Sequence, residues 1–493
     1  MMLNLCLCLL SFLLIGIAPM QSTPVYDEPF RPQFHYSPPH SWMNDPNGLV
    51  YFEGEYHLFY QYNPDDVVWG PMHWGHAVSP DLIHWETLPI ALYPDDIGTI
   101  FSGSIVIDEH NTAGFGASAM VAVYSYNTQS QGVAYSTDRG RTWTKYAGNP
   151  IIPALYPDFR DPKVFWHEES GQWVMVIAAG REAQFFTSPN LLDWTFASRF
   201  AAGHIVATWE VPDIFPLEIE GETKWVLLVS VGGHAPAGGS GIQYFIGEFD
   251  GQTFTNDNPP GTTLWFDYGA DNYAGTTWSN TPDGKRLYIG WMNNWVYGQS
   301  IPTSTWRGAA TLPRELRLAR TPEGIRLAQT PVEAVQQLRT PLGVWENLTV
   351  SDDLPLDVQG RTLEIIAEID AGTAERFGLV VQYGEIAGTR IVYNAARSQL
   401  LISRTDTTEA GYISGFNPAF GAPITLDENQ LRLHIFVDES SVEVFAQDGL
   451  VTLTSQTFVD PLADGLALFA NNGEIEVSRL EIYALSSIWK QGS

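Results

Sequence analysis

The chain has 493 residues, with 56 acidic against 25 basic side chains and a formal net charge of −31. This length exceeds what one hydrophobic core usually serves and predicts two domains, while so acidic a chain is a poor partner for nucleic acid or an anionic membrane. Apolar residues make up 44% of the sequence, which predicts a globular protein rather than a disordered one.

The N-terminus carries an apolar run over residues 5–18, followed by small and polar residues. Because the run is too short to span a bilayer comfortably, we interpret residues 1–22 as a secretory signal peptide, which predicts a secreted protein with no membrane attachment after cleavage. No Lys or Arg precedes the run, so a buried or membrane-anchoring segment is the alternative. Cys6 and Cys8 both lie in this segment, so the mature protein would have no disulfide and no thiolate ligand.

Residues 30–336 contain a weak internal repeat in which a polar turn is closed by an aromatic residue. The closing residues are Trp85, Trp143, Trp194 and Phe254. Their spacing of roughly 50–60 residues is typical of propeller blades with long loops. An interleaved second repeat places a hairpin turn before an apolar strand, as at residues 53–60 and 220–229. Five such units fit, which predicts that residues 30–336 form a five-bladed β-propeller.

The sequence pattern changes after residue 336. We interpret residues 337–350 as a linker, and the short alternating strands of residues 351–490 as a β-sandwich. The expected fold is therefore all-β. No carboxylates gather beside Pro and Trp in the second domain, which favours a structural or accessory role for it.

Three carboxylates stand in motifs dense in Pro, Trp and Arg, each before a strand-like run. The motifs are Trp42-Met43-Asn44-Asp45-Pro46-Asn47-Gly48, Phe159-Arg160-Asp161-Pro162 and Trp209-Glu210-Val211-Pro212-Asp213. Because Pro is confined to strand edges or first positions, Asp45 and Asp161 are expected to open their strands. The first strand of every propeller blade faces the central axis, so the three carboxylates are expected to converge at one mouth.

Converging carboxylates suit the cleavage of a glycosidic bond, which needs one protonated and one ionised carboxyl group. Glu210 lies between Trp209 and Pro212, and apolar surroundings favour the protonated form that a general acid requires. The alternatives are an Asx-turn role for Asp45, an exposed rim position for Glu210, and an ion pair between Asp161 and Arg160. Adjacent residues of a strand face opposite ways, which argues against that ion pair.

Other candidate sites are weaker. His73 and His76 have a spacing that suggests a metal ligand pair, but residues three apart on a strand point to opposite faces, so no metal site is predicted. The glycine-rich stretch over residues 231–241 lacks the Lys and the following helix of a phosphate-binding loop.

Taken together, these motifs resemble the signatures of the glycoside hydrolase family 32 β-fructosidases, of the levanase, exo-inulinase and invertase type. The similarity runs over roughly residues 34–490 and includes Phe101-Ser102-Gly103-Ser104 and residues 306–308, 312–316 and 437–445. It implies a five-bladed propeller with a C-terminal sandwich that hydrolyses terminal β-D-fructofuranosyl residues of levan, inulin and sucrose with net retention. The stretch over residues 69–76 is more similar to exo-acting than to endo-acting members.

The resemblance also implies roles for individual residues. Asp45 would be the nucleophile, Glu210 the acid and then the base, and Asp161 the carboxylate that stabilises the transition state. The substrate-binding residues would be Trp42, Met43, Asn44, Gln61, Trp69, Phe101, Ser102, Arg160 and Trp295. No metal or organic cofactor is implied.

Several alternatives stay open at this point. Val211 stands where many relatives carry Cys, which leaves the pH optimum open. A fructosyltransferase, an endo-acting fructanase, a non-catalytic fructan-binding propeller and an arabinose-acting propeller are the alternative functions. The sequence does not rank levan, inulin and sucrose, and it leaves both a monomer and a homodimer open.

Overall fold

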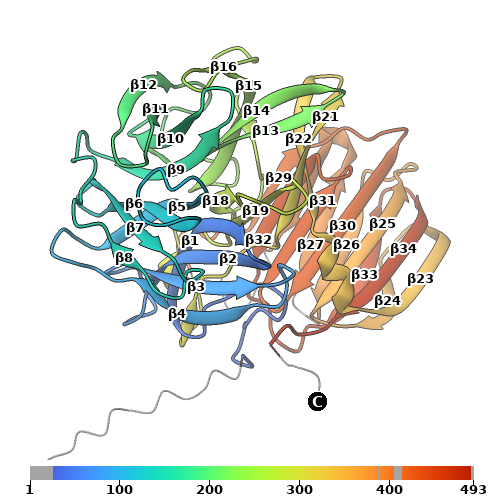
Figure 1. Ribbon diagram of the computed structural model, residues 1–493. Helices are drawn as coiled ribbons and strands as arrows, with labels where there is room; N and C mark the ends of the chain where they lie inside the picture. The colour runs from blue at the N-terminus through green and yellow to red at the C-terminus, as the bar shows by residue number, and fades with distance from the viewer. Residues whose placement is uncertain (1–25, 386–387, 405–412, 490–493) are drawn as a thin grey trace, which may run out of the picture.

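The computed structural model describes residues 26–385, 388–404 and 413–489, so the predicted signal peptide lies outside the described residues. Figure 1 shows two β-rich bodies side by side, the first coloured from blue to yellow-green and the second from orange to red. The predicted all-β fold, a five-bladed propeller followed by a sandwich, is confirmed. In the described part of the chain no helix is long and apolar enough to cross a membrane.

Five antiparallel sheets follow one another as the propeller blades. Blade one contains β1 (Ser41–Phe52), β2 (Glu55–Asn63), β3 (His73–Ser79) and β4 (Glu86–Leu92). Blade two contains β5 (Ile100–Asp108), β6 (Ala119–Tyr126), β7 (Gln131–Ser136) and β8 (Thr144–Lys145). Blade three contains β9 (Phe159–His167), β10 (Gln172–Ala179), β11 (Ala183–Ser188) and β12 (Thr195–Phe200).

The extra strands β17 and β20 come from the part of the chain that forms the last two blades. Blade four contains β13 (Trp209–Ile219), β14 (Glu222–Val231), β15 (Gly241–Phe249) and β16 (Phe254–Asn256), and β17 (Leu264–Trp265) pairs with β15. Blade five contains β18 (Tyr273–Thr277), β19 (Arg286–Trp291), β21 (Arg314–Thr321) and β22 (Gly324–Pro331). The short 3-10 helix η1 (Gly298–Ser300) and β20 (Trp306–Arg307) lie between β19 and β21 in sequence. Strand β20 leaves blade five and pairs in parallel with β1, which closes the ring.

The sequence repeat has a local physical cause. Each aromatic-closed turn joins the third strand of a blade to the fourth, and a short polar side chain in the turn accepts hydrogen bonds from backbone amides ahead of it. The accepting residues are Asp81, Asp138, Asn190 and Asp250. These are Asx-type turns, so blades one to four share one turn chemistry that is legible in the sequence.

The sandwich consists of two six-stranded sheets. The first contains β23 (Arg339–Val350), β34 (Ile475–Leu485), β25 (Leu363–Asp370), β30 (Gln430–Asp438), β31 (Ser441–Ala446) and β32 (Val451–Gln456). The second contains β24 (Leu354–Gln359), β33 (Gly465–Asn471), β26 (Arg376–Tyr383), β27 (Thr389–Asn394), β28 (Gln399–Ser403) and β29 (Ala419–Pro423). A 3-10 helix, η3 (Ala395–Arg397), joins β27 to β28.

The linker expected over residues 337–350 is not a linker in the structure. The 3-10 helix η2 (Glu333–Leu338) follows the propeller directly, and β23 then pairs along its length with β34. Strand β23 lies at the edge of its sheet, most of its side chains are exposed, and it contains Pro341 and Gly343. An edge strand of this kind lacks the alternating apolar pattern by which a strand is recognised.

A buried charged cluster joins the N-terminal segment, the propeller and the sandwich. The His35 ring lies between two carboxylates, with Nδ1 2.8 Å from Asp438 and Nε2 2.8 Å from Glu443. Burial alone would lower the pKa of His35, but hydrogen bonds to these two carboxylates raise it to about 9. Glu443 also accepts hydrogen bonds from the Leu312 amide and the Arg314 guanidinium. The sandwich motif at residues 437–445 therefore holds the two bodies together.

Candidate active site

The first strand of every blade is interrupted by a β-bulge near its beginning. The interruptions fall at residues 43–46 of β1, 100–103 of β5, 160–163 of β9, 210–213 of β13 and 273–276 of β18. A bulge leaves residues outside the hydrogen-bonded ladder and turns a side chain toward a new direction. The five bulges therefore give each blade one point at which a side chain can be presented near the axis.

The bulges and the adjoining loops enclose a cavity of about 330 Å³, called the catalytic pocket below. Ten of the twelve predicted site residues line it: Asn44, Asp45, Gln61, Trp69, Phe101, Ser102, Arg160, Asp161, Glu210 and Trp295. Trp42 and Met43 are not among its lining residues, and both side chains are fully buried. The Trp42 indole Nε1 donates to the Asn44 side chain at 2.7 Å, so Trp42 supports a lining residue instead.

Asp45 is held by one hydrogen bond to each carboxylate oxygen. The Asn44 amide donates to Oδ1 at 2.9 Å, and the Ser102 hydroxyl donates to Oδ2 at 2.7 Å. Burial raises the pKa of Asp45 to about 6, the two hydrogen bonds oppose this rise, and the charge of Glu210 adds to it. The carboxylate is therefore fixed in orientation and is ionised above about pH 6.

Asp161 occupies the bulge of β9 with a positive φ of 66°, a conformation that Asp tolerates better than most residues. Its amide donates to the Ser125 hydroxyl at 2.9 Å, and its carboxylate accepts from the Val211 amide at 3.0 Å. Burial raises the pKa of Asp161 to about 7, against the opposing charge of Arg160. A third carboxylate with hydrogen-bonding capacity is thus held against the pocket.

Glu210 has polar rather than apolar partners, so the predicted apolar surroundings are wrong. The Arg160 guanidinium donates to Oε1 at 2.9 Å, and the Tyr273 hydroxyl donates to Oε2. Trp209 is fully buried and packs against Phe245. The sequence misleads here because neighbours along a strand face opposite sides.

Arg160 bridges two acidic residues, neither of which is Asp161. Its guanidinium contacts Asp158 at 2.6 Å and Glu210 at 2.9 Å. The ion pair between Arg160 and Asp161 that was set aside as an alternative is absent from the ion pairs of the described residues. Arg160 therefore links blade three to blade four at the pocket.

Tyr273 is a candidate functional residue that sequence reasoning missed. It is the first residue of β18, is buried, and donates its hydroxyl to Glu210. The bulges of the four preceding inner strands contain Asp45, Ser102, Asp161 and Glu210. Extending that repeat to blade five would have pointed to Tyr273.

Val211 contributes through its backbone. It has a positive φ of 44°, which is unusual for a β-branched residue, and its amide holds Asp161. Its side chain packs in an apolar cluster with Trp42, Met72 and Tyr273. The side chain thus lies behind the carboxylates.

The sandwich reaches the loop that carries Trp295. The Asn417 side chain donates to the Ala237 carbonyl, and the Asn294 side chain donates to the Gly238 carbonyl at 3.1 Å. The amide of Trp295 donates to the Ser240 hydroxyl at 3.3 Å. One side of the catalytic pocket is therefore supported from the second domain.

The histidines singled out by spacing have other partners. His76 lies 3.0 Å from the His57 ring, and the His73 ring lies 3.0 Å from the Pro71 carbonyl. Among residues 26–385, 388–404 and 413–489 no three His, Cys, Asp or Glu side chains are grouped so that they could hold a metal ion.

Comparisons with known proteins agree with this geometry. Residues 35–331 match the glycosyl hydrolases family 32 N-terminal domain, and residues 334–484 match the glycosyl hydrolases family 32 C-terminal domain. The chain is 48% identical to the levanase of Bacillus subtilis (strain 168) over 488 residues, which cover 94% of this chain and 72% of that protein.

Two further comparisons cover nearly the whole length of both aligned proteins. The extracellular exo-inulinase of Aspergillus awamori is 39% identical over 529 residues, 97% of this chain and 98% of that protein. The crystal structure of exo-inulinase from Aspergillus awamori superimposes with a TM-score of 0.90 at 37% identity, covering 94% of this chain and 100% of that chain.

Proposed function

Because the chain belongs to glycosyl hydrolase family 32, we propose that it is a retaining exo-β-fructosidase. It hydrolyses terminal β-D-fructofuranosyl residues of fructans such as levan and inulin, and of sucrose, and releases fructose. The observation that carries this proposal is the meeting of Asp45, Asp161 and Glu210 in one pocket of about 330 Å³. A pocket at the small end of the range for ligand sites suits a single sugar unit.

The first step transfers the fructosyl unit to the enzyme. The Asp45 carboxylate attacks the anomeric carbon C2, and the bond between C2 and the glycosidic oxygen breaks as Glu210 gives that oxygen its proton. The hydrogen bonds from Asn44 and Ser102 orient Asp45 before the substrate arrives. The leaving chain departs as an alcohol, and the fructosyl unit remains joined to Asp45 as an ester.

The second step releases fructose. Glu210, now ionised, takes a proton from a water molecule, whose oxygen attacks C2 while the bond to Asp45 breaks. Two displacements at C2 give net retention. The Arg160 and Tyr273 donors support the ionised Glu210 of this step.

Asp161 stabilises the transition state without forming a bond to the sugar. The sugar ring gains positive charge as the bond to the leaving oxygen breaks, and a nearby carboxylate stabilises that charge. Trp69, Phe101 and Trp295 offer aromatic faces to the C–H surfaces of the sugar, and Gln61 offers an amide to its hydroxyls.

The relatives favour hydrolysis over the other functions. They are named levanase and exo-inulinase, which favours an exo-acting hydrolase over a transferase or an endo-acting enzyme. All three carboxylates are present, which disfavours a non-catalytic binding propeller. The extracellular relative supports secretion, for which residues 1–22 would serve as the signal peptide. A homodimer stays a prediction, to be checked by light scattering of the purified protein.

The test is a time course on levan, inulin and sucrose without added metal, with products separated by size. Fructose as the sole early product supports the proposal, and NMR should show the β-furanose form first. A ladder of oligomers would instead indicate endo cleavage or transfer. Asp45→Asn and Glu210→Gln should each lower kcat by at least about a thousandfold, whereas the exposed Glu218→Gln on the same strand as Glu210 should leave it unchanged. Near-normal rates in either site variant would overturn the assigned roles.

A further inference from the structure

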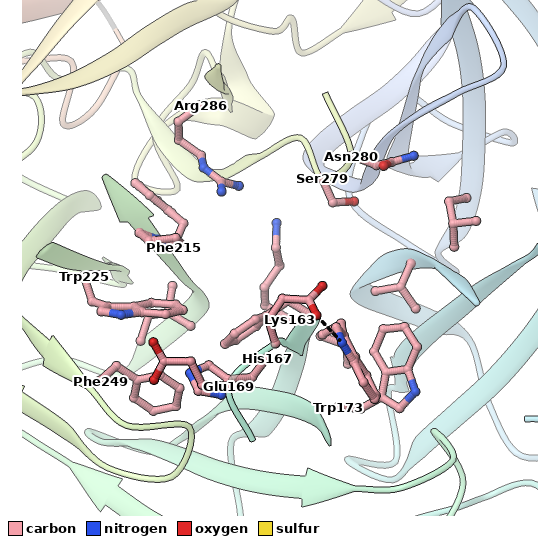
Figure 2. A pocket seen from close by; sticks show the side chains of 18 of the residues that line it. Lys163, His167, Glu169, Trp173, Phe215, Trp225, Phe249, Ser279, Asn280 and Arg286 are labelled. Carbon is pink, nitrogen blue, oxygen red and sulfur yellow. Dashed lines mark hydrogen bonds between the residues drawn. The ribbon is translucent and has the colours of Figure 1, made fainter. Parts of the chain in front are cut away.

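A second and larger cavity lies at the other end of the propeller axis. It measures about 730 Å³ and is called the distal cavity below. The two cavities lie along the same inner strands: on β9, Asp161 lines the catalytic pocket, and Lys163, two residues further along, lines the distal cavity. Figure 2 shows side chains arranged around the distal cavity, with Arg286 and Phe215 on one side and Trp173 on another.

Two cations in the distal cavity differ in how well their donors are satisfied. The Lys163 ammonium contacts the Asp213 carboxylate, the Thr276 hydroxyl and the Thr277 carbonyl at 3.3, 3.1 and 2.7 Å. The Nε of Arg286 has no hydrogen-bond partner, and its Nη1 makes two long contacts of 3.3 and 3.4 Å. Arg286 forms none of the ion pairs found within 4.0 Å among the described residues. Arg286 therefore keeps unsatisfied hydrogen-bonding capacity at the cavity wall, where its guanidinium lies over the Phe215 ring.

The charge of the distal cavity disfavours an anion. Lys163 and Arg286 are opposed by four carboxylates in the lining, at Glu109, Glu168, Glu169 and Glu248. A phosphate or sulfate that approached Arg286 would meet these carboxylates, in a protein that is already strongly acidic. A neutral ligand that both donates and accepts hydrogen bonds fits this mixture of groups better.

The apolar part of the lining is largely aromatic. The Trp225 ring packs against Phe165 and Phe249 on one side, and the Trp166 ring packs against Trp173 on the other. Aromatic faces combined with a few directed polar groups are what a sugar needs, because a sugar has C–H faces and a periphery of hydroxyls. The cavity has more than twice the volume of the catalytic pocket, which suits more than one sugar unit.

We propose that the distal cavity binds a segment of a neutral fructan chain, with Arg286 donating to the sugar hydroxyls between the aromatic walls. This inference rests on the proposed function, because it takes its ligand from the same polymer. Since the two cavities lie at opposite ends of the axis, the distal cavity holds a neighbouring chain. It keeps the enzyme on a many-chained substrate, which raises the local concentration of chain ends at the catalytic pocket.

Affinity electrophoresis of inactive protein tests the proposal, with native gels that contain inulin or levan and with dextran gels as the reference. Glu210→Gln removes turnover, so retardation reports binding alone. Adding Arg286→Gln should weaken the apparent affinity for fructan by roughly tenfold, the scale of one lost contact to a charged donor. The matched control is Arg320→Gln, an exposed arginine of the same blade, which should leave retardation unchanged.

A second variant and an activity readout separate the outcomes. Glu169→Arg, at an exposed position in the lining, puts a long side chain across the cavity and should reduce retardation to the level that the catalytic pocket alone supports, even if the Arg286 variant fails to fold. In the otherwise unmodified enzyme both variants should raise the KM for polymeric inulin and leave kcat/KM for sucrose unchanged. Full retardation of Glu169→Arg, or equal retardation in dextran gels, would overturn the proposal. Retardation by a wild-type protein that releases no fructose would instead refute the proposed function and leave the distal cavity standing.

Discussion

Removing the hydroxyl of Ser102 should move the acid limb of the pH–rate profile to higher pH. Ser102 is buried and donates to Asp45 at 2.7 Å, and this hydrogen bond opposes the burial that raises the pKa of Asp45 to about 6. Asp45 must be ionised to attack, so activity rises as the pH rises through its pKa. The Ser102→Ala variant leaves Asn44 as the remaining side-chain donor, and the pKa of Asp45 therefore rises further.

The size of the shift follows from the strength of the lost contact. A hydrogen bond to a charged group contributes about 1.5–3 kcal/mol, and about 1.4 kcal/mol corresponds to one pKa unit. The limb should therefore move by about one to two units. Because Asp161 lies in the same cluster and its pKa is raised to about 7, the limb reports the coupled pair of carboxylates.

The assay is kcat/KM on sucrose between pH 3 and pH 9, with Tm measured at each pH. Ser104→Ala is the matched control, because Ser104 lies on the same strand, is also buried, and donates to the Pro162 carbonyl rather than to a carboxylate. Its profile should keep the wild-type limb. An unshifted limb in folded Ser102→Ala, or an equal shift in both variants, would refute the account of how Asp45 is tuned.

Three further changes have expected outcomes. Tyr273→Phe removes a donor to Glu210 and should lower kcat by roughly tenfold or more with little change in Tm; an unchanged kcat would contradict its role. Below pH 6.5 the raised pKa of His35 contributes about 3 kcal/mol to the free energy of unfolding, and this contribution is lost as the pH rises through about 9. Tm should therefore fall from pH 7 to pH 10, and a flat Tm would contradict this role of His35. Gly103→Ala would place a Cβ 2.2 Å from a backbone carbonyl oxygen and should lower Tm by several degrees, whereas Gly261→Ala, in open space, should not; equal Tm values would argue against the clash.

The parts of the fold that the sequence predicted are those with a local chemical cause. The aromatic-closed turns are legible because each needs an Asx-type acceptor, and Asp45 and Asp161 stand out because Pro follows each of them. Edge strand β23 was not predicted because most of its side chains are exposed and its apolar and polar residues do not alternate. The contacts of Glu210 with Arg160 and Tyr273 were not predicted because these two residues come from other blades, and such contacts form only in the closed ring.

Ring closure by β20 also fixes the order in which the enzyme is assembled. Residues 306–307 pair with residues 41–42, immediately before the strand segment that carries Asp45. The nucleophile is therefore among the first residues to be synthesised, yet its strand gains its second neighbour, β20, only after three further blades and the first two strands of blade five have been made. Pairing across so long a stretch of chain forms late and slowly. A nascent chain thus contains Asp45 long before the active site exists. The site is complete only when the two-residue strand β20 has paired with β1.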